Sequence, residues 1–528
     1  MHTTTELRQK PPQPEAVCFV VNCSSNGQTV HQRWLKTFTL FASEEDNAAS
    51  LIPIRPPITE VGSEAALRKA RQMLETCRNT HESCPTFHLN PLPTRAIDVG
   101  ANNGEIKLHC ASFGEEHAYT ALSYCWGGPQ PVLLTMENLE HMTERVHYEL
   151  LPQTIKDAIK VTRSLGIRYL WVDAICIIQD EDEEAKSKEI GQMGKIYKNA
   201  AVTIFAASAG SAADGFLHSR PTLVSSSLPL RCADGTLGVV HLAIGESHNI
   251  MGRLVSRGWT LQETLLSPRK LVYGEKELVW DCETNKEPKI PSSYYELASS
   301  FRHLPPETFV RDGAIVTPST ANRVWCSLLN EYAKRQLSFP EDRLAAVMGV
   351  IAELKPIFRD ECLHGLWRQN FVSQLSWFRD HASHDLDADA ILECAPEWSW
   401  ASRVFPIDFV LFEPDATDEW QIIDRRLMLH RKLRPGRDVP RGSNPQWQIH
   451  YDFLDPREPY QSDYFCLEHN GMEVYYLCLC EHTAGNNEVT MAVVQVEEES
   501  VFRRVGIVIN QSSTSWFEGV HPQKVTLI

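Results

Sequence analysis

Short apolar runs alternate with an amphipathic stretch in the middle of the chain. The run YTALSY (Tyr119–Tyr124) indicates a strand that stops at the strong breaker Gly127-Gly128-Pro129. After Pro152, apolar positions recur at helical spacing, which predicts a helix with an inner face of Ile155, Ala158, Ile159, Thr162 and Leu165. The next run, YLWVDAICII (Tyr169–Ile178), is apolar on both faces, as is typical of a central parallel strand. This order of strand, helix and strand predicts a βαβ unit.

Further elements extend this βαβ unit. The pattern predicts a second helix over Glu181–Asn199, and the apolar run AAVTIFAA (Ala200–Ala207) predicts a third buried strand. Lys270–Tyr273 and Glu277–Cys282 predict a hairpin around Gly274. The predicted fold class is therefore α/β, with a mostly parallel central sheet and flanking helices. Its sites should lie at the carboxyl ends of the strands.

The flanks of this α/β region follow different patterns. Glu60–Arg78 predicts a helix with an inner stripe of Ala65, Leu67, Ala70, Met73 and Leu74. Helical patterns dominate from Asn322 to Phe378, and strand patterns from Trp420 to Val525. The central domain should therefore be followed by a helical and then a β-rich C-terminal region.

Length and charge narrow the class of protein. The 528 residues suggest two or three domains, and the formal net charge of −17 argues against a general binder of nucleic-acid phosphates. No apolar run approaches the ~18–20 residues that a membrane helix requires. The 15 cysteines are an odd number, and the polar first residues contain no apolar signal-peptide core. We therefore expect a cytoplasmic protein with reduced thiols, and neither nucleic acid nor a membrane as a partner.

Three sequence blocks resemble the fungal heterokaryon incompatibility (HET) domain family. The first block is ALSYCWGG (Ala121–Gly128). The second runs through LPQTIKDAIKVTRSLGIRYLWVDAICIIQDEDE (Leu151–Glu183) and MGKIYKNAAVTIFAASA (Met193–Ala209), and the third is RGWTLQETLLSPRKLVYG (Arg257–Gly274). Their order and spacing match the family's pattern. The segment CRNTHESC (Cys77–Cys84) is similar to the family's usual lead-in.

The resemblance predicts a division of the chain into five parts. They are an N-terminal tail with short strands (1–60), a helical and strand lead-in (61–118), the HET domain (119–285), a helical HET-associated region (286–410) and a β-rich C-terminal region (411–528). The chain departs from the family pattern at Gly258, where the family often has Ala, and at Ile178, where it commonly has Asp. The second departure weakens any role for a carboxylate at position 178.

The family resemblance implies a role in fungal non-self recognition, in which HET proteins trigger growth arrest or programmed cell death. It also implies a fold distantly similar to the TIR domain, an α/β domain that signals by self-association. Partners would be other incompatibility proteins or a second copy of the chain, with a small molecule as a candidate ligand. Some TIR domains cleave NAD, which makes an NAD glycohydrolase the first alternative. Some related proteins occur in neighbourhoods of secondary-metabolite genes, so an enzyme that acts on a small metabolite is the second.

Two acidic residues are the main catalytic candidates. Asp173 lies in an otherwise apolar run, where a carboxylate needs a partner. It either faces a ligand crevice or ties down a loop or Arg257. Glu263 follows Arg257 and Gln262 on a predicted short helix, so the three side chains are candidates for one cleft. Glu263 either stabilises a cationic transition state, as a glycosidase carboxylate does, or forms a structural ion pair with Arg257.

Three further residues are weaker site candidates. Cys176 is a candidate nucleophile, although its apolar neighbours favour a small buried hydrophobic residue. Trp126, beside Gly127-Gly128, would line a pocket for a planar ring or pack in the core. Ser123 is a candidate substrate contact or a strand hydroxyl.

Cys77, His81 and Cys84 have the spacing C-x3-H-x2-C, which places all three on one face of a helix. Thiolates and imidazole are the ligands that structural zinc prefers, so a structural zinc site is a candidate. A fourth ligand is needed, and His88, His109 and Cys110 are the candidates. The alternative is a helix end whose cysteines pack inward.

Overall fold

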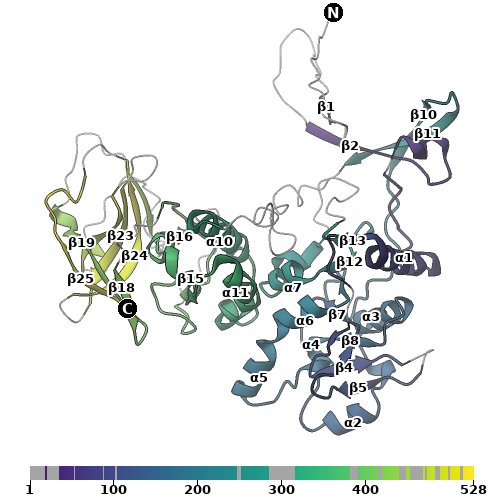
Figure 1. Cartoon of the computed structure of the whole chain (residues 1–528), viewed down its shortest axis with the longest axis horizontal. Coiled ribbons are helices and arrows are strands. Elements are labelled where there is room, and N and C mark those ends of the chain that lie inside the picture. Colours follow the sequence, from purple (N-terminus) through teal and green to yellow (C-terminus); the bar gives the residue numbers. More distant parts are fainter. Residues whose placement is uncertain are drawn as a thin grey trace, which may run out of the picture. The chain divides into compact units, whose positions relative to one another are not determined.

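The structure is a computed structural model, and its described residues form two compact units (Figure 1). The first unit consists of Met1–Ile190, Ile196–Leu254 and Ser267–Arg302, and the second of Gly191–Lys195, Val255–Leu266 and His303–Ile528. The described residues are 18–20, 35–52, 54–86, 89–100, 104–245, 251–284, 316–380, 391–413, 419–438, 447–451, 468–469, 472–481, 488–496, 500–511 and 515–528. The five-part division of the chain stays a prediction.

A seven-stranded sheet forms the centre of the first unit, in the order β13-β12-β9-β7-β8-β4-β5. Its four middle strands are mutually parallel: β12 (Arg269–Tyr273), β9 (Val202–Phe205), β7 (Tyr119–Ser123) and β8 (Tyr169–Trp171). The outer strands pair antiparallel with their neighbours: β13 (Leu278–Cys282), β4 (Arg95–Asp98) and β5 (Lys107–Cys110). The predicted parallel arrangement is thus confirmed at the centre, while short connections such as the β12–β13 hairpin make the edges antiparallel.

Helices cover both faces of this sheet, which explains why β7, β8 and β9 are wholly buried. On one face, the Thr120 hydroxyl shares a 2.7 Å hydrogen bond with that of Thr162 in α3 (Gln153–Ser164). On the other, the Tyr119 hydroxyl donates to the carbonyl of Ile196 in α6 (Met193–Asn199) over 2.7 Å. Figure 1 shows α3 and α6 on opposite sides of β7 and β8.

The two amphipathic helices of the first unit form largely where the periodicity predicts them. The inner stripe of α3 is buried as predicted. The helix α1 (Glu64–Thr80) begins later than predicted, because the Ser63 hydroxyl caps it by accepting the amide of Ala66 over 3.1 Å. In the inner stripe of α1, Ala66 replaces Ala65, which is exposed, and Met73 is only half-buried.

The ten-residue strand predicted over Tyr169–Ile178 is wrong. The strand β8 ends at Trp171, and a short helix, α4 (Asp173–Cys176), follows. The pairings of β8 in the sheet end at Trp171, although its neighbour β7 runs on to Ser123. A run that is apolar on both faces fits a buried helix as well as a buried strand.

The single helix predicted over Glu181–Asn199 is also wrong. The chain forms α5 (Glu183–Ile190) and, after a turn at Gly191, α6. A glycine destabilises a helix interior because it loses the most backbone entropy on ordering.

The first unit also contains elements outside the central sheet. They are the helix α2 (Leu139–Glu144) and the 3-10 helices η1 (Asn47–Ser50), η3 (Tyr148–Leu150) and η4 (Gly252–Ser256). An antiparallel sheet has the order β1-β2-β11-β10, with β1 (Cys18–Val20), β2 (Leu35–Phe41), β11 (Leu237–Gly245) and β10 (Ser225–Arg231). A two-stranded pair joins β3 (Asn90–Pro91) and β6 (Glu116–His117).

The second unit has a helical part with a tryptophan-rich core. Its helices are α7 (Thr260–Leu266), α10 (Pro318–Ala333), α11 (Ala345–Phe358), α12 (Phe371–Gln374), η7 (Pro340–Arg343), η8 (Arg368–Asn370) and η9 (Trp400–Ser402). Two small pairs join β14 (Cys362–Leu363) to β15 (Leu366–Trp367), and β16 (Trp377–Arg379) to β17 (Ile407–Phe409). The fully buried core includes Trp325, Trp367, Trp377, Trp398 and Trp400.

The C-terminal part of the second unit is a closed β-barrel with extra strands. The barrel runs β19 (Arg426–Pro435), β25 (Pro522–Leu527), β24 (Val501–Asn510), β23 (Glu488–Gln495) and β22 (Met472–Cys480), and β22 pairs again with β19. Outside this ring lie β18 (Trp420–Ile423), β20 (Trp447–Tyr451), β21 (Glu468–His469) and η10 (Gly436–Asp438). The β-rich region predicted from the sequence is therefore confirmed.

Over the described parts of the chain, no helix has the length and apolar character needed to cross a membrane.

Candidate functional site

The carboxyl ends of β7 and β8 bring two predicted site residues together in the first unit. Trp126 lies three residues beyond β7, and Asp173 two residues beyond β8. The indole Nε1 of Trp126 donates to Oδ2 of Asp173 over 2.9 Å. The other carboxylate oxygen, Oδ1, accepts the amide of Ala174 over 2.7 Å. Asp173 therefore ties the loop after β7 to the start of α4, and both side chains stay half-buried.

The loop that carries Trp126 is held in place by a second loop. The carbonyl of Trp126 accepts the amide of Ala212 over 3.2 Å, and the side chain of Gln130 donates to the same carbonyl over 2.9 Å. The second loop is fixed by Asp214, whose carboxylate accepts the amides of Gly210 and Ser211 and the Ser211 hydroxyl over 2.7–3.0 Å. The hydrogen bond from that hydroxyl, supported by the two amides, keeps the pKa of Asp214 below its ordinary value. The indole of Trp126 is thus presented on a fixed turn.

Ser123 and Cys176 lie close in sequence to this pair but inside the sheet layer. Each is 1% exposed. The Sγ of Cys176 accepts the amide of Val172 over 3.4 Å, and burial raises the pKa of its thiol to about 12. A buried, protonated thiol is a poor nucleophile, so the geometry favours the structural interpretation of Cys176.

The other predicted catalytic cluster lies on α7 in the second unit. Glu263 is in the first turn of α7 and is 4% exposed, and Gln262 is 1% exposed. The carbonyl of Arg257 accepts the Thr260 hydroxyl over 2.8 Å and so holds the start of α7. The indole of Trp259 donates to Asp342 over 3.2 Å within the same unit. The roles of Arg257, Gln262 and Glu263 in catalysis or binding stay predictions.

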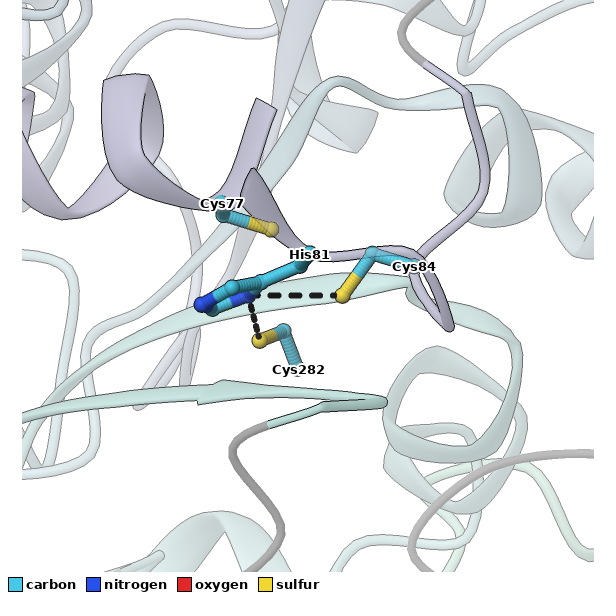
Figure 2. Close-up of side chains that lie close together, drawn as sticks. All are labelled: Cys77, His81, Cys84 and Cys282. Carbon is cyan, nitrogen blue, oxygen red and sulfur yellow. Dashed lines mark hydrogen bonds between the residues drawn. The ribbon is translucent and has the colours of Figure 1, made fainter. Parts of the chain in front are cut away.

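A second constellation gathers the three predicted metal ligands around a fourth residue. Figure 2 shows Cys77, His81, Cys84 and Cys282 with their side chains directed at one point, and one ligand atom of each lies within 4.8 Å of the others. Cys77 is in the last turn of α1, His81 and Cys84 follow this helix, and Cys282 ends β13. The three cysteines are buried and His81 is half-buried.

The structure corrects the expected fourth ligand. His109 and Cys110 lie on β5, where His109 Nε2 contacts Glu115 over 2.9 Å and Cys110 is exposed. His88 lies outside the described residues. Cys282 takes this place because β13 brings a residue from far along the sequence beside α1.

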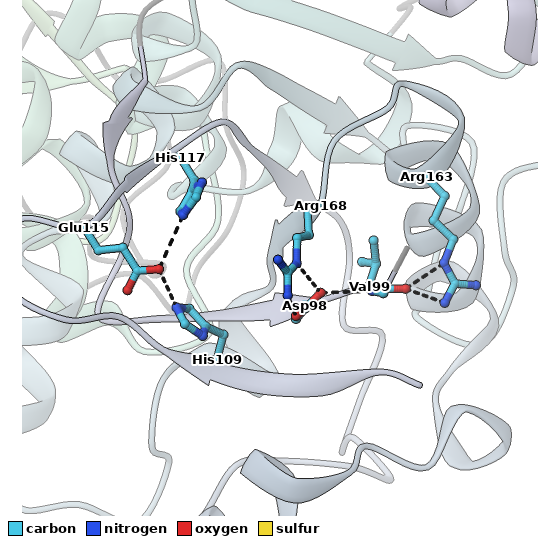
Figure 3. Close-up of polar contacts among 8 residues, drawn as sticks. Asp98, Val99, His109, Glu115, His117, Arg163 and Arg168 are labelled. Carbon is cyan, nitrogen blue, oxygen red and sulfur yellow. Dashed lines mark hydrogen bonds and ion pairs between the residues drawn. The ribbon is translucent and has the colours of Figure 1, made fainter. Parts of the chain in front are cut away.

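Charged and aromatic side chains meet at the β4–β5 edge of the central sheet, as Figure 3 shows. Glu115 contacts His109 over 2.9 Å and His117 over 3.5 Å, while Asp98 pairs with Arg168 over 2.7 Å. Burial raises the pKa of the Asp98 carboxyl, but the hydrogen bonds from Arg168 and the Gly100 amide outweigh it, so the pKa lies below its ordinary value. These contacts join β4, β5 and β6 to the loops beside them, which indicates a structural network.

Two buried charged residues, Arg220 and Asp157, hold loops near the carboxyl ends of the parallel strands and were not predicted from the sequence. The Arg220 guanidinium donates to the carbonyl of Gly274 over 2.7 Å and to the hydroxyl of Ser208 over 2.8 Å. Asp157 of α3 accepts the amides of Phe216 and Leu217 over 2.7 and 3.1 Å. Asp157 lies on the side of α3 opposite the predicted apolar stripe, so the periodicity did not mark it as buried. Arg220 lies in a loop without any periodic pattern.

Comparison with known proteins bears on the same region. Residues 119–263 match the family model described as heterokaryon incompatibility protein (HET). No curated protein and no solved structure matched the chain. The matched segment begins at the first residue of β7 and ends at Glu263, so it includes Trp126, Asp173 and the start of α7. Residues 119–263 of this chain are a heterokaryon incompatibility (HET) domain.

Proposed function

We propose that this chain is an effector of fungal non-self recognition whose HET domain signals through protein contacts. The observation that carries the proposal is the family match over residues 119–263. Partners would be other incompatibility proteins or a second copy of the chain, and the response would be growth arrest or programmed cell death. The hydrogen bond between Trp126 and Asp173 supports a structural role for this acid, since a signalling domain needs a rigid surface rather than a reactive carboxylate.

Induced expression in a filamentous fungus tests this proposal. We expect colony extension to stop and a membrane-impermeant dye to enter the hyphae once the full chain accumulates. The same experiment with Asp173→Asn and Glu263→Gln separates signalling from catalysis. A signalling domain keeps the response in every variant that still folds. Unchanged growth at a verified protein level, before and after fusion with an incompatible strain, contradicts the proposal.

A second candidate function is NAD cleavage, as in the TIR domains that the fold is expected to resemble. One observation favours it: an indole and a carboxylate, Trp126 and Asp173, meet at the carboxyl edge of parallel strands, where α/β domains bind ligands. Cleavage would break the bond between ribose and nicotinamide, and water would then add to the cationic ribose. A carboxylate stabilises such a cation, and Glu263 is the candidate for this role.

Nicotinamide release from NAD by the purified full chain tests this second function. The wild-type protein is compared with Glu263→Gln and with Glu144→Gln, which removes an exposed carboxylate at the end of α2. An NAD glycohydrolase loses turnover in Glu263→Gln alone and keeps its melting temperature in both variants. Absence of release at concentrations that allow self-association excludes this function and leaves signalling as the proposal.

A further inference from the structure

The ligand atoms of Cys77, His81, Cys84 and Cys282 all lie within 4.8 Å of one another, and two of the distances match a tetrahedral metal site. Nδ1 of His81 lies 3.4 Å from Sγ of Cys282 and 3.7 Å from Sγ of Cys84. A zinc ion with bonds of about 2.3 Å to sulfur and about 2.0–2.1 Å to nitrogen places these atoms about 3.6 Å apart in a tetrahedron. Nδ1 of His81 and the sulfurs of Cys84 and Cys282 therefore already lie near the spacing that zinc requires.

The surroundings of the cluster also fit a thiolate-rich metal site. Three thiolates and one Zn²⁺ ion carry one net negative charge, and the buried Arg269 guanidinium donates from Nε to Sγ of Cys77 over 3.3 Å. A second nitrogen of Arg269 donates to the carbonyl of Pro85, in the turn that follows Cys84. The hydroxyl of Thr284 lies 3.4 Å from Sγ of Cys84. Such outer contacts orient the ligands and balance their charge.

A disulfide accounts for these residues less well than a metal ion does. It would use two of the three thiols and leave the third thiol and the imidazole at the same point. A structural zinc site uses all four ligands and leaves no open coordination position.

We propose that Cys77, Cys84, Cys282 and Nδ1 of His81 bind one zinc ion that fastens the end of α1 to the edge strand β13. His81 and Cys282 are 201 residues apart in the sequence, so the ion closes a very long loop. The site is structural, and its role does not depend on the proposed function. It makes folding of the first unit dependent on metal, because the ligands converge only in the folded chain.

Metal analysis of the full chain, purified with reductant and without chelator, tests this inference. We expect about one zinc per chain in the wild-type protein, as four protein ligands imply. The variant Cys282→Ser should lose the zinc. The matched control Cys110→Ser changes an exposed cysteine of the same unit and should keep it. A wild-type protein without zinc that also takes up none when zinc is added overturns the inference.

Two further measurements remain decisive if Cys282→Ser fails to fold. Cobalt(II) added to the chelator-treated, reduced wild-type protein should give the visible spectrum of a tetrahedral site with sulfur ligands. His81→Cys supplies a fourth thiolate, so it should still bind one ion and strengthen the sulfur-to-cobalt absorption. An octahedral cobalt spectrum overturns the inference, and so does a disulfide between two of these cysteines that persists in the native protein purified with reductant.

Discussion

The turn after β7 provides a sharp test of how the Trp126–Asp173 pair is held. Gly127 has φ +72°, and a Cβ atom there would lie 2.2 Å from Cβ and 2.7 Å from Cα of Ser211. Ordinary carbon contacts are about 3.5–4.0 Å. The Ser211 loop cannot easily retreat, because Asp214 fixes it with three hydrogen bonds. We therefore expect Gly127→Ala to destabilise this part of the molecule.

A second glycine, Gly114, separates the two causes of this loss of stability, which are the left-handed backbone and the steric overlap with Ser211. Gly114 has a similar φ of +77° but no atom within 4 Å of the position of its Cβ. The left-handed backbone costs about 1–2 kcal/mol for alanine in either variant. Overpacking adds about 1–3 kcal/mol in Gly127→Ala only. The free energies of unfolding of the two variants should therefore differ by about 2 kcal/mol, or roughly 4–8 °C in melting temperature.

Hydrogen–deuterium exchange of peptides from β7 and β9 in increasing urea measures this difference within the first unit. The double variant Gly127→Ala/Asp214→Ala adds a second test, because removal of the Asp214 hydrogen bonds frees the Ser211 loop to move. Gly127→Ala should lower the free energy of unfolding less in that background, and the difference is a measurable coupling energy. If Gly127→Ala and Gly114→Ala lowered the free energy of unfolding equally, the argument that the Ser211 loop holds this turn would be refuted.

Three other changes should follow the same reasoning. Asp157→Ala leaves two amides without their acceptor and should lower the free energy of unfolding by about 2–5 kcal/mol in urea titrations, while Asp157→Asn should lower it less. The pKa of Asp98 is lowered in the folded state, so its pairing with Arg168 stabilises the protein above the unfolded pKa of about 3.9 and is lost as pH falls through the folded value. The urea midpoints of wild type and Asp98→Asn should therefore differ at pH 6 and converge as the pH falls from the unfolded pKa through the lower folded pKa. Arg504→Lys removes the planar guanidinium that donates two hydrogen bonds to the carbonyls of Leu375 and Trp377. The amides of β24 should then exchange faster with deuterium, and unchanged exchange rates would contradict this.

Local patterns were enough to predict the elements that carry a clear period. The stripe of α3 and the β12–β13 hairpin depend on neighbours within a few residues, and the structure has them as predicted. The run Tyr169–Ile178 failed because its composition suits a buried helix and a buried strand alike. The local pattern does not decide between them, and in the structure the pairings of β8 end at Trp171 and the helix α4 follows.

Contacts between distant segments lay beyond the sequence patterns. Trp126 and Asp173 were each predicted as site residues, but their hydrogen bond depends on how two loops leave neighbouring strands. Cys282 was visible as the end of a predicted strand. Its place beside His81 follows from the order of strands in the sheet, which no periodicity encodes.

The family match covers only part of the central sheet to which its strands belong. Residues 119–263 contain β7, β8 and β9 but exclude β4, β5, β12 and β13, which complete the sheet on both sides. All four proposed zinc ligands also lie outside these residues. A fragment cut at the match would expose two open edges of wholly buried strands, which favours aggregation. We therefore expect a fragment of residues 119–263 to be insoluble when expressed alone. A fragment of residues 35–284 should be soluble and should protect the backbone amides of β7 from hydrogen exchange. A monomeric 119–263 fragment with protected β7 amides would show that the HET domain folds without the edge strands of the sheet.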